Sequence, residues 1–443
     1  MTEGVSPSAW VRTTVPVMPE MLLDDVLSHW GLFDQATADD PYLLYAQVRQ
    51  QAPVHRVLLG DGRSAWLVCG YEEVRRALTD PRLSKELRRV DEARSGIVPQ
   101  GLLHPLTAYH MLSADPPDHT RLRQLASHAF TPSRVEALRP RVQAITDELL
   151  DTIDGQERTD LVASFAFPLP IIVICELLGV PVADRDRLRT WFRQSLASPG
   201  APANDPPARA AADRLYDYLR NLVEAKRREP ADDLFSVLVA AGDGDRLSED
   251  ELISTAWLLV LAGHETTVNL IANGMAALLR HPDELARLRA DLSLVPSAVE
   301  EFLRYDAPVH HATFRVTTTP IELGGVEIPA LEQVLILLAG ADRDPRRFAR
   351  PDVLDVGRGD NRHLAFGHGI HYCLGAPLAR LEGQVAFTSL LGRFPHLAPA
   401  VPPEELHWTY RLVLRSMLEL PVVLQPPAPA PAGEPAASKA NIA

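Results

Sequence analysis

Cysteine is scarce in this chain of 443 residues. Only Cys69, Cys175 and Cys373 occur, and they lie far apart. Three widely spaced thiols do not provide the disulfide framework of a small secreted domain, so a reducing cytoplasm is the expected compartment. The N-terminus also lacks a basic segment followed by an apolar one, so it is not expected to act as a signal peptide.

Basic residues are outnumbered, and no clean apolar run of membrane-spanning length is present. The chain has 44 Lys and Arg against 58 Asp and Glu, a formal net charge of -14. This balance argues against a general affinity for nucleic acid. The most apolar stretch, residues 165–182, contains Pro168, Pro170 and Glu176, which favours a buried helix over a membrane span.

The middle of the chain reads as one large domain between two weakly patterned ends. Residues 1–35 form an N-terminal extension, and residues 425–443 form a Pro/Ala-rich tail that is expected to be disordered. Because no linker interrupts residues 36–424, they are expected to form a single domain. The apolar spacing predicts a mainly α fold with small β-sheets. Helices are expected at 41–51, 71–79, 119–129, 133–153, 169–179, 184–197, 208–228 and 232–241, a hairpin at 54–69 and short strands at 314–339.

The strongest helical pattern runs over residues 248–280. It begins with a capping box formed by Ser248 and Glu251, and it ends just before Pro282. About 32 residues at 1.5 Å each give a length of roughly 48 Å, enough to cross a whole domain. Its centre, AWLLVLAG at 256–263, is apolar on every side and predicts a helix buried all round.

Polar residues interrupt this helix where it should be most buried. Gly263, Glu265 and Thr266 follow the apolar centre, although glycine destabilises a helix and a buried carboxylate is costly. One interpretation is a polar patch satisfied between helices, and Gly263 with the threonines could open the backbone ladder. The other is a groove lined by Ala262 and Gly263, with an acid and an alcohol beside it that move protons.

Cys373 has unusual neighbours. Gly367, Gly369 and Gly375 surround it and permit a tight turn and the close approach of a flat group, and the helical pattern after it places the thiol at a helix N-terminus. An inert thiol would need none of these. A zinc cage with His363, His368 and His371 lacks the usual spacing, and a nucleophile lacks an identifiable basic partner. A haem-thiolate ligand fits best.

The stretch FGHGIHYCLG at 366–375 resembles the haem-binding signature of the cytochrome P-450 family, and APLARLE at 376–382 continues it in the style of soluble bacterial members. The resemblance covers about residues 36–424. It implies the cytochrome P-450 fold, a triangular helical prism with a long central helix over haem b. Cys373 would be the axial ligand of the haem iron, and Phe366, Gly367, Gly375 and Ala262 would contact the cofactor.

Three further motifs extend the resemblance. AGHETT at 262–267 is similar to the family's oxygen-binding groove, which places Glu265 and Thr266 at the acid and alcohol positions. EFLR at 301–304 is similar to the family's E-x-x-R pair, which implies a buried structural pair of Glu301 and Arg304 completed by Arg358. DPPDHTRLR at 115–123 resembles the segment that meets the haem propionates. The implied propionate-binding residues are His119, Arg123, Arg315 and His371.

The resemblance implies an enzyme that inserts one atom of O2 into a substrate and needs an outside electron donor. A ferredoxin with an NAD(P)H-driven reductase, no membrane or nucleic-acid partner, and a monomeric enzyme are expected. The region around the long helix is similar to actinobacterial macrolide and polyketide hydroxylases such as the pikromycin-pathway enzyme. Terpene, steroid or peptide oxidation, and a haem-binding sensor or carrier without turnover, remain alternatives.

Substrate contacts are expected from several separate segments. The residues named are Ala262, Val309, His310 and Leu414, together with the irregular 85–112 region and the 195–207 loop. The proline-rich 198–207 part of this loop would act as a lid. His310 and His311 are each expected either in the pocket or on the surface. Two departures from the family pattern are noted: Leu331 stands where glycine is more usual, and Gly357 stands where a bulkier residue is common.

Overall fold

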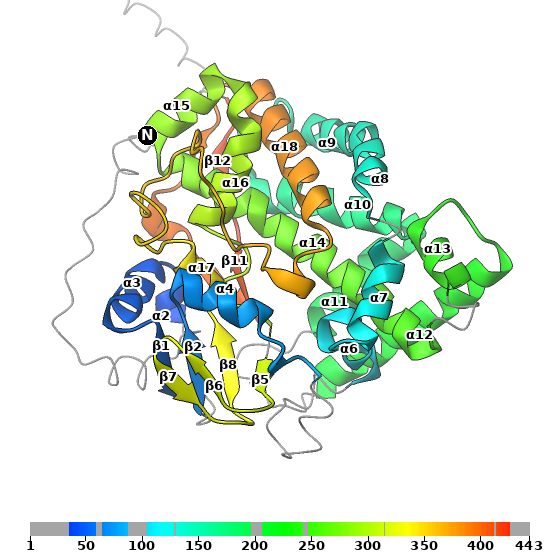
Figure 1. Ribbon diagram of the computed structural model, residues 1–443. Helices are drawn as coiled ribbons and strands as arrows, with labels where there is room; N and C mark the ends of the chain where they lie inside the picture. The colour runs from blue at the N-terminus through cyan, green and yellow to red at the C-terminus, as the bar shows by residue number, and fades with distance from the viewer. Residues whose placement is uncertain are drawn as a thin grey trace, which may run out of the picture.

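The structure is a computed structural model that describes residues 35–58, 64–86, 104–127, 130–195, 206–241, 247–313, 315–411 and 413–425. The N-terminal extension, the tail, most of the 85–112 region and most of the 195–207 loop lie outside these residues. The described part is mainly helical, and its largest sheet lies at one edge of the molecule, whereas smaller sheets lie elsewhere (Figure 1). The predicted fold class is confirmed. No helix among the described residues is long and apolar enough to cross a membrane.

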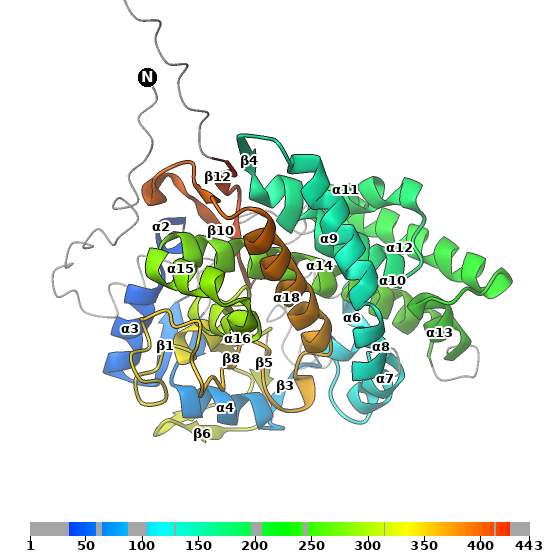
Figure 2. The same ribbon diagram turned by 90° about the horizontal axis from the view of Figure 1, so that it is seen from above.

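The long central helix is α14, Glu249–Leu279. The predicted capping box is present, because Glu251 N donates to Ser248 Oγ and Ser248 N donates to Glu251 Oε2 at 3.2 and 2.8 Å. Helices α10 (Pro168–Leu177), α16 (Val295–Tyr305) and α18 (Ala376–Arg393) pack against it. Figure 2 shows α14 crossing the interior with α18 and α9 (Arg139–Ile153) on one side of it.

Burial of α14 is complete except at one place. Residues 252–260 and 267–279 are buried all round, whereas 261–266 are less buried except at His264. Gly263 is explained by packing, because a Cβ there would lie 2.9 Å from Ile174 Cδ1 of α10. The helix runs without interruption through this stretch. The interpretation that Gly263 and the threonines open the backbone ladder is therefore wrong.

The predicted hairpin is present as β1 (Val54–Leu58) and β2 (Ser64–Val68), with Val54 opposite Val68. It belongs to a five-stranded sheet of order β1-β2-β8-β5-β3, in which β8 (Gln333–Ile336) runs parallel to β2. The strand-rich 314–339 region supplies β5 (Arg315–Thr317) and β8 to this sheet and forms a separate β6–β7 hairpin. The sheet thus joins segments more than two hundred residues apart.

Three smaller sheets complete the β-structure of the described residues. They pair β6 (Ile321–Leu323) with β7 (Val326–Ile328), β10 (Trp408–Arg411) with β11 (Leu414–Met417), and β12 (Pro421–Val423) with both β4 (Arg158–Asp160) and β9 (Ala398–Pro399), while β3 is Leu83–Ser84. The remaining α-helices are α2 (Gln35–Ala38), α3 (Tyr42–Gln51), α4 (Tyr71–Thr79), α6 (Pro105–Ala108), α7 (Asp118–Ser127), α8 (Pro132–Ala137), α11 (Arg185–Ser195), α12 (Pro206–Arg228), α13 (Leu234–Ala241), α15 (Pro282–Ala290) and α17 (Leu338–Ala341).

Two local features differ from, or sharpen, the sequence analysis. The single helix expected at 133–153 is two helices, α8 and α9, that meet at Leu138. Pro140 causes the break, because proline has no N–H to donate and is tolerated only in the first turn of a helix. Leu331 has a φ of +59°, in the left-handed region that favours glycine. Leucine therefore adopts at this turn the backbone conformation for which glycine is the usual residue.

Candidate haem-thiolate site

The loop before α18 is wound tightly around Cys373. Gly367 N donates to Leu364 O at 2.7 Å, and Cys373 N donates to Phe366 O at 2.9 Å. Gly367 and Gly369 have φ values of +72° and +76°, which only glycine adopts without strain. The 364–373 segment is therefore closed by its own backbone, and it delivers Cys373 three residues before the first turn of α18.

The electrostatics of the thiol are set by two opposing influences. Burial raises the pKa of Cys373 on balance, and the N–H groups of Gly375 and Ala376 and the charge of Arg123 offset part of this rise. A Cβ on Gly375 would lie 4.0 Å from Cys373 Sγ, so this glycine leaves space beside the sulfur. The sulfur thus has anion-stabilising amides on the protein side, as expected at a helix N-terminus.

The less buried stretch of α14 forms the second part of the site. Ala262 is exposed and Glu265 and Thr266 are half-buried, although the helix is buried on both sides of them along the chain. Thr266 Oγ1 donates to Ala262 O at 2.6 Å. The ring of His264 packs edge-on against Phe167, with centroids 4.6 Å apart. Among the described residues of α14 between 252 and 279, only this stretch is accessible from outside the helix packing.

The four residues expected at the propionates come together around His371. The rings of His119 and His371 are 4.3 Å apart. Burial, followed by the charges of Lys85 and Arg315 and the neighbourhood of His119 and Arg123, lowers the pKa of His371. Lys85 was missed by sequence reasoning, because a lysine is taken as a surface charge by default. Here it is buried, and its Nζ donates to Thr313 Oγ1.

This cluster has more positive than negative charge. Arg315 is 3% exposed, and its Nε has no hydrogen-bond partner among the described residues. His119 is also 3% exposed, and neither of its ring nitrogens forms a well-made hydrogen bond there. Buried cations and donors left without acceptors are costly. Two carboxylates, such as haem carries, would satisfy them. Together with the space beside Cys373 Sγ, this donor set fits the edge and face of a haem group.

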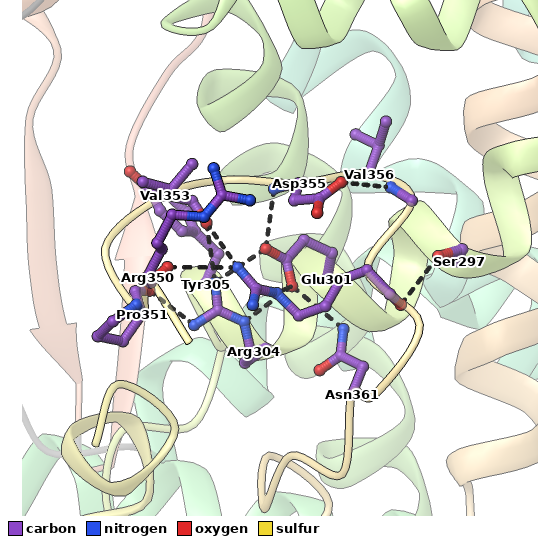
Figure 3. Close-up of polar contacts among 12 residues, drawn as sticks. Ser297, Glu301, Arg304, Tyr305, Arg350, Pro351, Val353, Asp355, Val356 and Asn361 are labelled. Carbon is purple, nitrogen blue, oxygen red and sulfur yellow. Dashed lines mark hydrogen bonds and ion pairs between the residues drawn. The ribbon is translucent and has the colours of Figure 1, made fainter. Parts of the chain in front are cut away.

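The E-x-x-R residues, Glu301 and Arg304, form a buried ion pair (Figure 3). Arg304 Nε and Nη2 donate to the two carboxylate oxygens of Glu301, both at 2.8 Å, and neither side chain is exposed. Arg358 Nε lies 3.0 Å from Glu301 Oε2, as the resemblance implied, and Asn361 Nδ2 lies 3.1 Å from the same oxygen. Arg304 also donates to the carbonyls of Asp342, Pro351 and Val353. The pair therefore fastens α16 to the 342–361 segment.

The segments expected to contact substrate are partly brought together. Val309 and Leu414 form an isolated β-bridge, and Leu414 is buried. His310 is completely buried, its Nδ1 lies 3.0 Å from Tyr45 Oη, and its Nε2 lies 3.8 Å from Asp306. The expectation of a surface position for His310 is wrong. The side chain of His310 contacts Tyr45 and Asp306 in the interior, and its backbone N–H donates to Val413 O, next to Leu414.

The zinc alternative finds no support. No group of three or more His, Cys, Asp and Glu side chains placed to hold a metal ion occurs among the residues that the structure describes.

Glu382 and Asp342 are buried acids that sequence reasoning also missed. Burial raises the pKa of Glu382 to about 8 and that of Asp342 to about 7.

Comparison with known proteins agrees with this geometry. Residues 182–418 match the family model of cytochrome P-450. Cytochrome P-450 107B1 of Saccharopolyspora erythraea is 48% identical over 402 residues, 88% of this chain and 96% of the relative. The monooxygenase PikC of Streptomyces venezuelae is 48% identical over 398 residues, 88% of this chain and 93% of the relative.

Solved structures show the same relationship. The tirandamycin C-bound monooxygenase TamI superposes with a TM-score of 0.82 at 47% identity, covering 88% of this chain and 99% of that one. Members of the family bind haem b, use O2 as co-substrate and receive electrons from redox partners. The chain belongs to the cytochrome P-450 family and is a haem-dependent monooxygenase.

Proposed function

We propose that this monooxygenase hydroxylates or epoxidises a macrolide or another polyketide, with Cys373 as the axial ligand and a ferredoxin as electron donor. Similarity over nearly the whole chain carries the substrate class. The 6-deoxyerythronolide B hydroxylase of Saccharopolyspora erythraea is 45% identical over 392 residues, and TamI was solved with tirandamycin C. A steroid-like substrate is the second candidate, because the vitamin D(3) 25-hydroxylase of Pseudonocardia autotrophica is also 45% identical, over 400 residues.

A spectral titration separates the two candidates. Substrate bound beside Ala262 would change the surroundings of the haem, and the Soret band would report this change. Macrolactones and their glycosides are titrated in parallel with a secosteroid. We expect a saturable shift with a member of the macrolactone series at micromolar concentration. Saturation by the secosteroid alone would contradict the polyketide proposal.

The bound haem supplies the activation of O2, and the protein residues position it and manage protons. His119, Arg123, Arg315 and His371, with Lys85, would hold the two carboxylates. Phe366, Gly367 and Gly375 would lie against its proximal face, and Ala262 would line the distal side. The ion pair of Glu301 and Arg304 with Arg358 would hold the proximal segment in place. Val309 and Leu414 would contact substrate.

The hydroxyl of Thr266 is oriented for a defined task. The Thr266 hydroxyl donates its hydrogen bond to Ala262 O. Its lone pairs therefore remain available to accept a hydrogen bond from a water molecule beside this stretch of α14. Glu265, the adjacent carboxylate, would pass protons from solvent to that water. Thr266 thus orders the last water of a proton path without having to ionise.

Replacing this hydroxyl should uncouple oxygen consumption from product formation. In Thr266→Ala the haem is retained, but the yield of product per NAD(P)H falls roughly tenfold or more, with hydrogen peroxide as the diverted product. The measurement compares NAD(P)H consumed, product and peroxide. Thr266→Ser keeps the hydroxyl and should retain most of the coupling. Full coupling in Thr266→Ala would rule out this role.

The face around the cysteine loop has the character of a docking surface for an acidic protein. Ile370 and Tyr372 are 50% and 38% exposed, and Arg123 and Arg380 lie at the same loop and remain partly accessible. Helix α4, which packs against the loop, carries the exposed Arg76. An apolar centre with arginines around it matches the proposed ferredoxin, whose electron must reach Cys373 over a short distance.

Reversing the charge of Arg76 should weaken this docking. At low ionic strength Arg76→Glu is expected to raise the KM for ferredoxin by roughly three- to tenfold, and the difference should fade at high salt because exposed charges are screened. Steady-state rates against ferredoxin concentration at two salt concentrations measure it. Arg220→Glu, on α12, is the control and should leave KM unchanged. A salt-independent effect would contradict electrostatic docking.

A further inference from the structure

Arg380, on the second turn of α18, is held by a carboxylate from another helix. Its Nε and Nη2 donate to the two oxygens of Glu300 on α16, at 2.6 and 2.8 Å. Although burial raises the pKa of Glu300, the hydrogen bonds from Arg380 and His363 outweigh it and lower the pKa to about 2. Glu300 is therefore ionised, and the positive charge of Arg380 is matched by one negative charge.

His363 completes the group, and its tautomer follows from its hydrogen bonds. Ala365 N donates to His363 Nδ1 at 3.2 Å, so Nδ1 is the acceptor of the ring. Nε2 then carries the proton and donates to Glu300 Oε2 at 3.1 Å. The ring is neutral in this arrangement. Glu300, His363 and Arg380, here called the proximal triad, therefore have a net charge of zero.

The triad reaches the cysteine loop through Tyr372. Arg380 Nη1 donates to Tyr372 Oη at 3.2 Å, and its guanidinium lies 4.6 Å from the centre of the Phe366 ring. Arg123 Nη2 donates to the carbonyl of the same tyrosine at 2.7 Å. Two arginines thus hold the residue directly before Cys373, one by its side chain and one by its backbone.

We propose that the proximal triad sets the electrostatic field at Cys373 and thereby the reduction potential of the enzyme. The inference rests on the proposed role of Cys373 as the axial ligand. The triad residues are positioning residues, because they act through Tyr372 and through charge. Accepting one electron adds a negative charge to the iron–thiolate unit, so a nearby cation favours reduction and a nearby anion opposes it. In the Glu300–Arg380 pair the effect of the cation on the potential is offset by the effect of the anion.

The test is a redox titration of the holoenzyme with mediators. Glu300→Gln leaves Arg380 unbalanced and is expected to raise the potential, whereas Arg380→Gln leaves Glu300 unbalanced and is expected to lower it. Each shift should correspond to a three- to tenfold change in the one-electron equilibrium constant, where tenfold is about 59 mV. The double variant restores neutrality and should lie near the wild-type potential. Glu176→Gln is the matched control, because Arg141 holds Glu176 in the same two-bond geometry between α9 and α10.

A purely structural triad would give a different result. Loosening of the loop would shift the potential in the same direction in both single variants, and the double variant would be the most altered, which overturns the proposal. If Arg380→Gln does not retain haem, Arg380→Lys is used in its place. Because lysine keeps the positive charge, Arg380→Lys should keep the wild-type potential, whereas Glu300→Gln should raise the potential. If Arg380→Lys shifted the potential as much as Glu300→Gln, the proposal would also be overturned. Carbon monoxide spectra separate failure of this proposal from failure of the proposed ligand. A wild-type spectrum without thiolate character would refute Cys373 as the ligand.

Discussion

Cys373→Ala is expected to abolish the strongly red-shifted Soret band that a thiolate-ligated haem shows when it is reduced and exposed to carbon monoxide. The other two cysteines cannot take over. Cys69 Sγ donates to the carbonyls of Ala52 and Pro53, and Cys175 is buried on α10, so neither belongs to the loop before α18. Product formation is expected to fall below detection, because the anionic sulfur donates the electron density that oxygen activation needs.

The controls for this experiment lie within the same chain. Cys69→Ala and Cys175→Ala should retain the thiolate spectrum, although both sites are buried and some stability will be lost. Haem content is measured separately from the spectrum, so that loss of ligation is distinguished from loss of cofactor. A wild-type carbon monoxide spectrum in Cys373→Ala would refute Cys373 as the ligand of the haem iron.

Glu301→Leu is the substitution with the largest expected effect on stability. It leaves Arg304 and Arg358 facing a buried site without their carboxylate, and breaking a buried pair in this way costs about 3–5 kcal/mol. The peptide N–H of Asp355 and the amide of Asn361 lose an acceptor as well. Urea unfolding followed by circular dichroism measures the loss, and we expect haem retention to fall with it.

An exposed pair of the same type provides the comparison. Glu136 and Arg139 are three residues apart, as Glu301 and Arg304 are, but their side chains are 62% and 41% exposed. Glu136→Gln is therefore expected to leave the free energy of unfolding nearly unchanged. If Glu301→Leu behaved like Glu136→Gln, the ion pair would contribute nothing particular to the proximal segment.

Local patterns carried much of the fold. The capping box at Ser248 fixed the start of α14 to the residue, and the alternation around 54–69 identified the hairpin, because both signals depend only on neighbours in sequence. Pro140 shows the limit of this reasoning. The apolar period continues through it, and the break between α8 and α9 becomes visible only when its missing N–H is counted.

Contacts between distant segments could not be predicted in the same way. Gly263 looked like a weak point in a helix, whereas its cause is the approach of Ile174, some ninety residues earlier. Lys85 was not singled out, because a lysine is taken as a surface residue by default, and His310 was left open between a pocket and a surface position. Each is buried by a partner that no short pattern specifies: Thr313 for Lys85, and Tyr45 with Asp306 for His310.

The last strands of the chain have a consequence for how the protein is made. β12 pairs with β4, so residues 421–423 complete a sheet that begins at residue 158. Arg415 donates to the carbonyls of Ala38 and Asp39 and binds Asp306, and Trp408 N donates to Asp39. These contacts can form only after residues 408–423 have been synthesised, because they join segments more than 350 residues apart. We therefore expect α2 and β4 to be fixed late in folding, since contacts of large sequence separation form slowly.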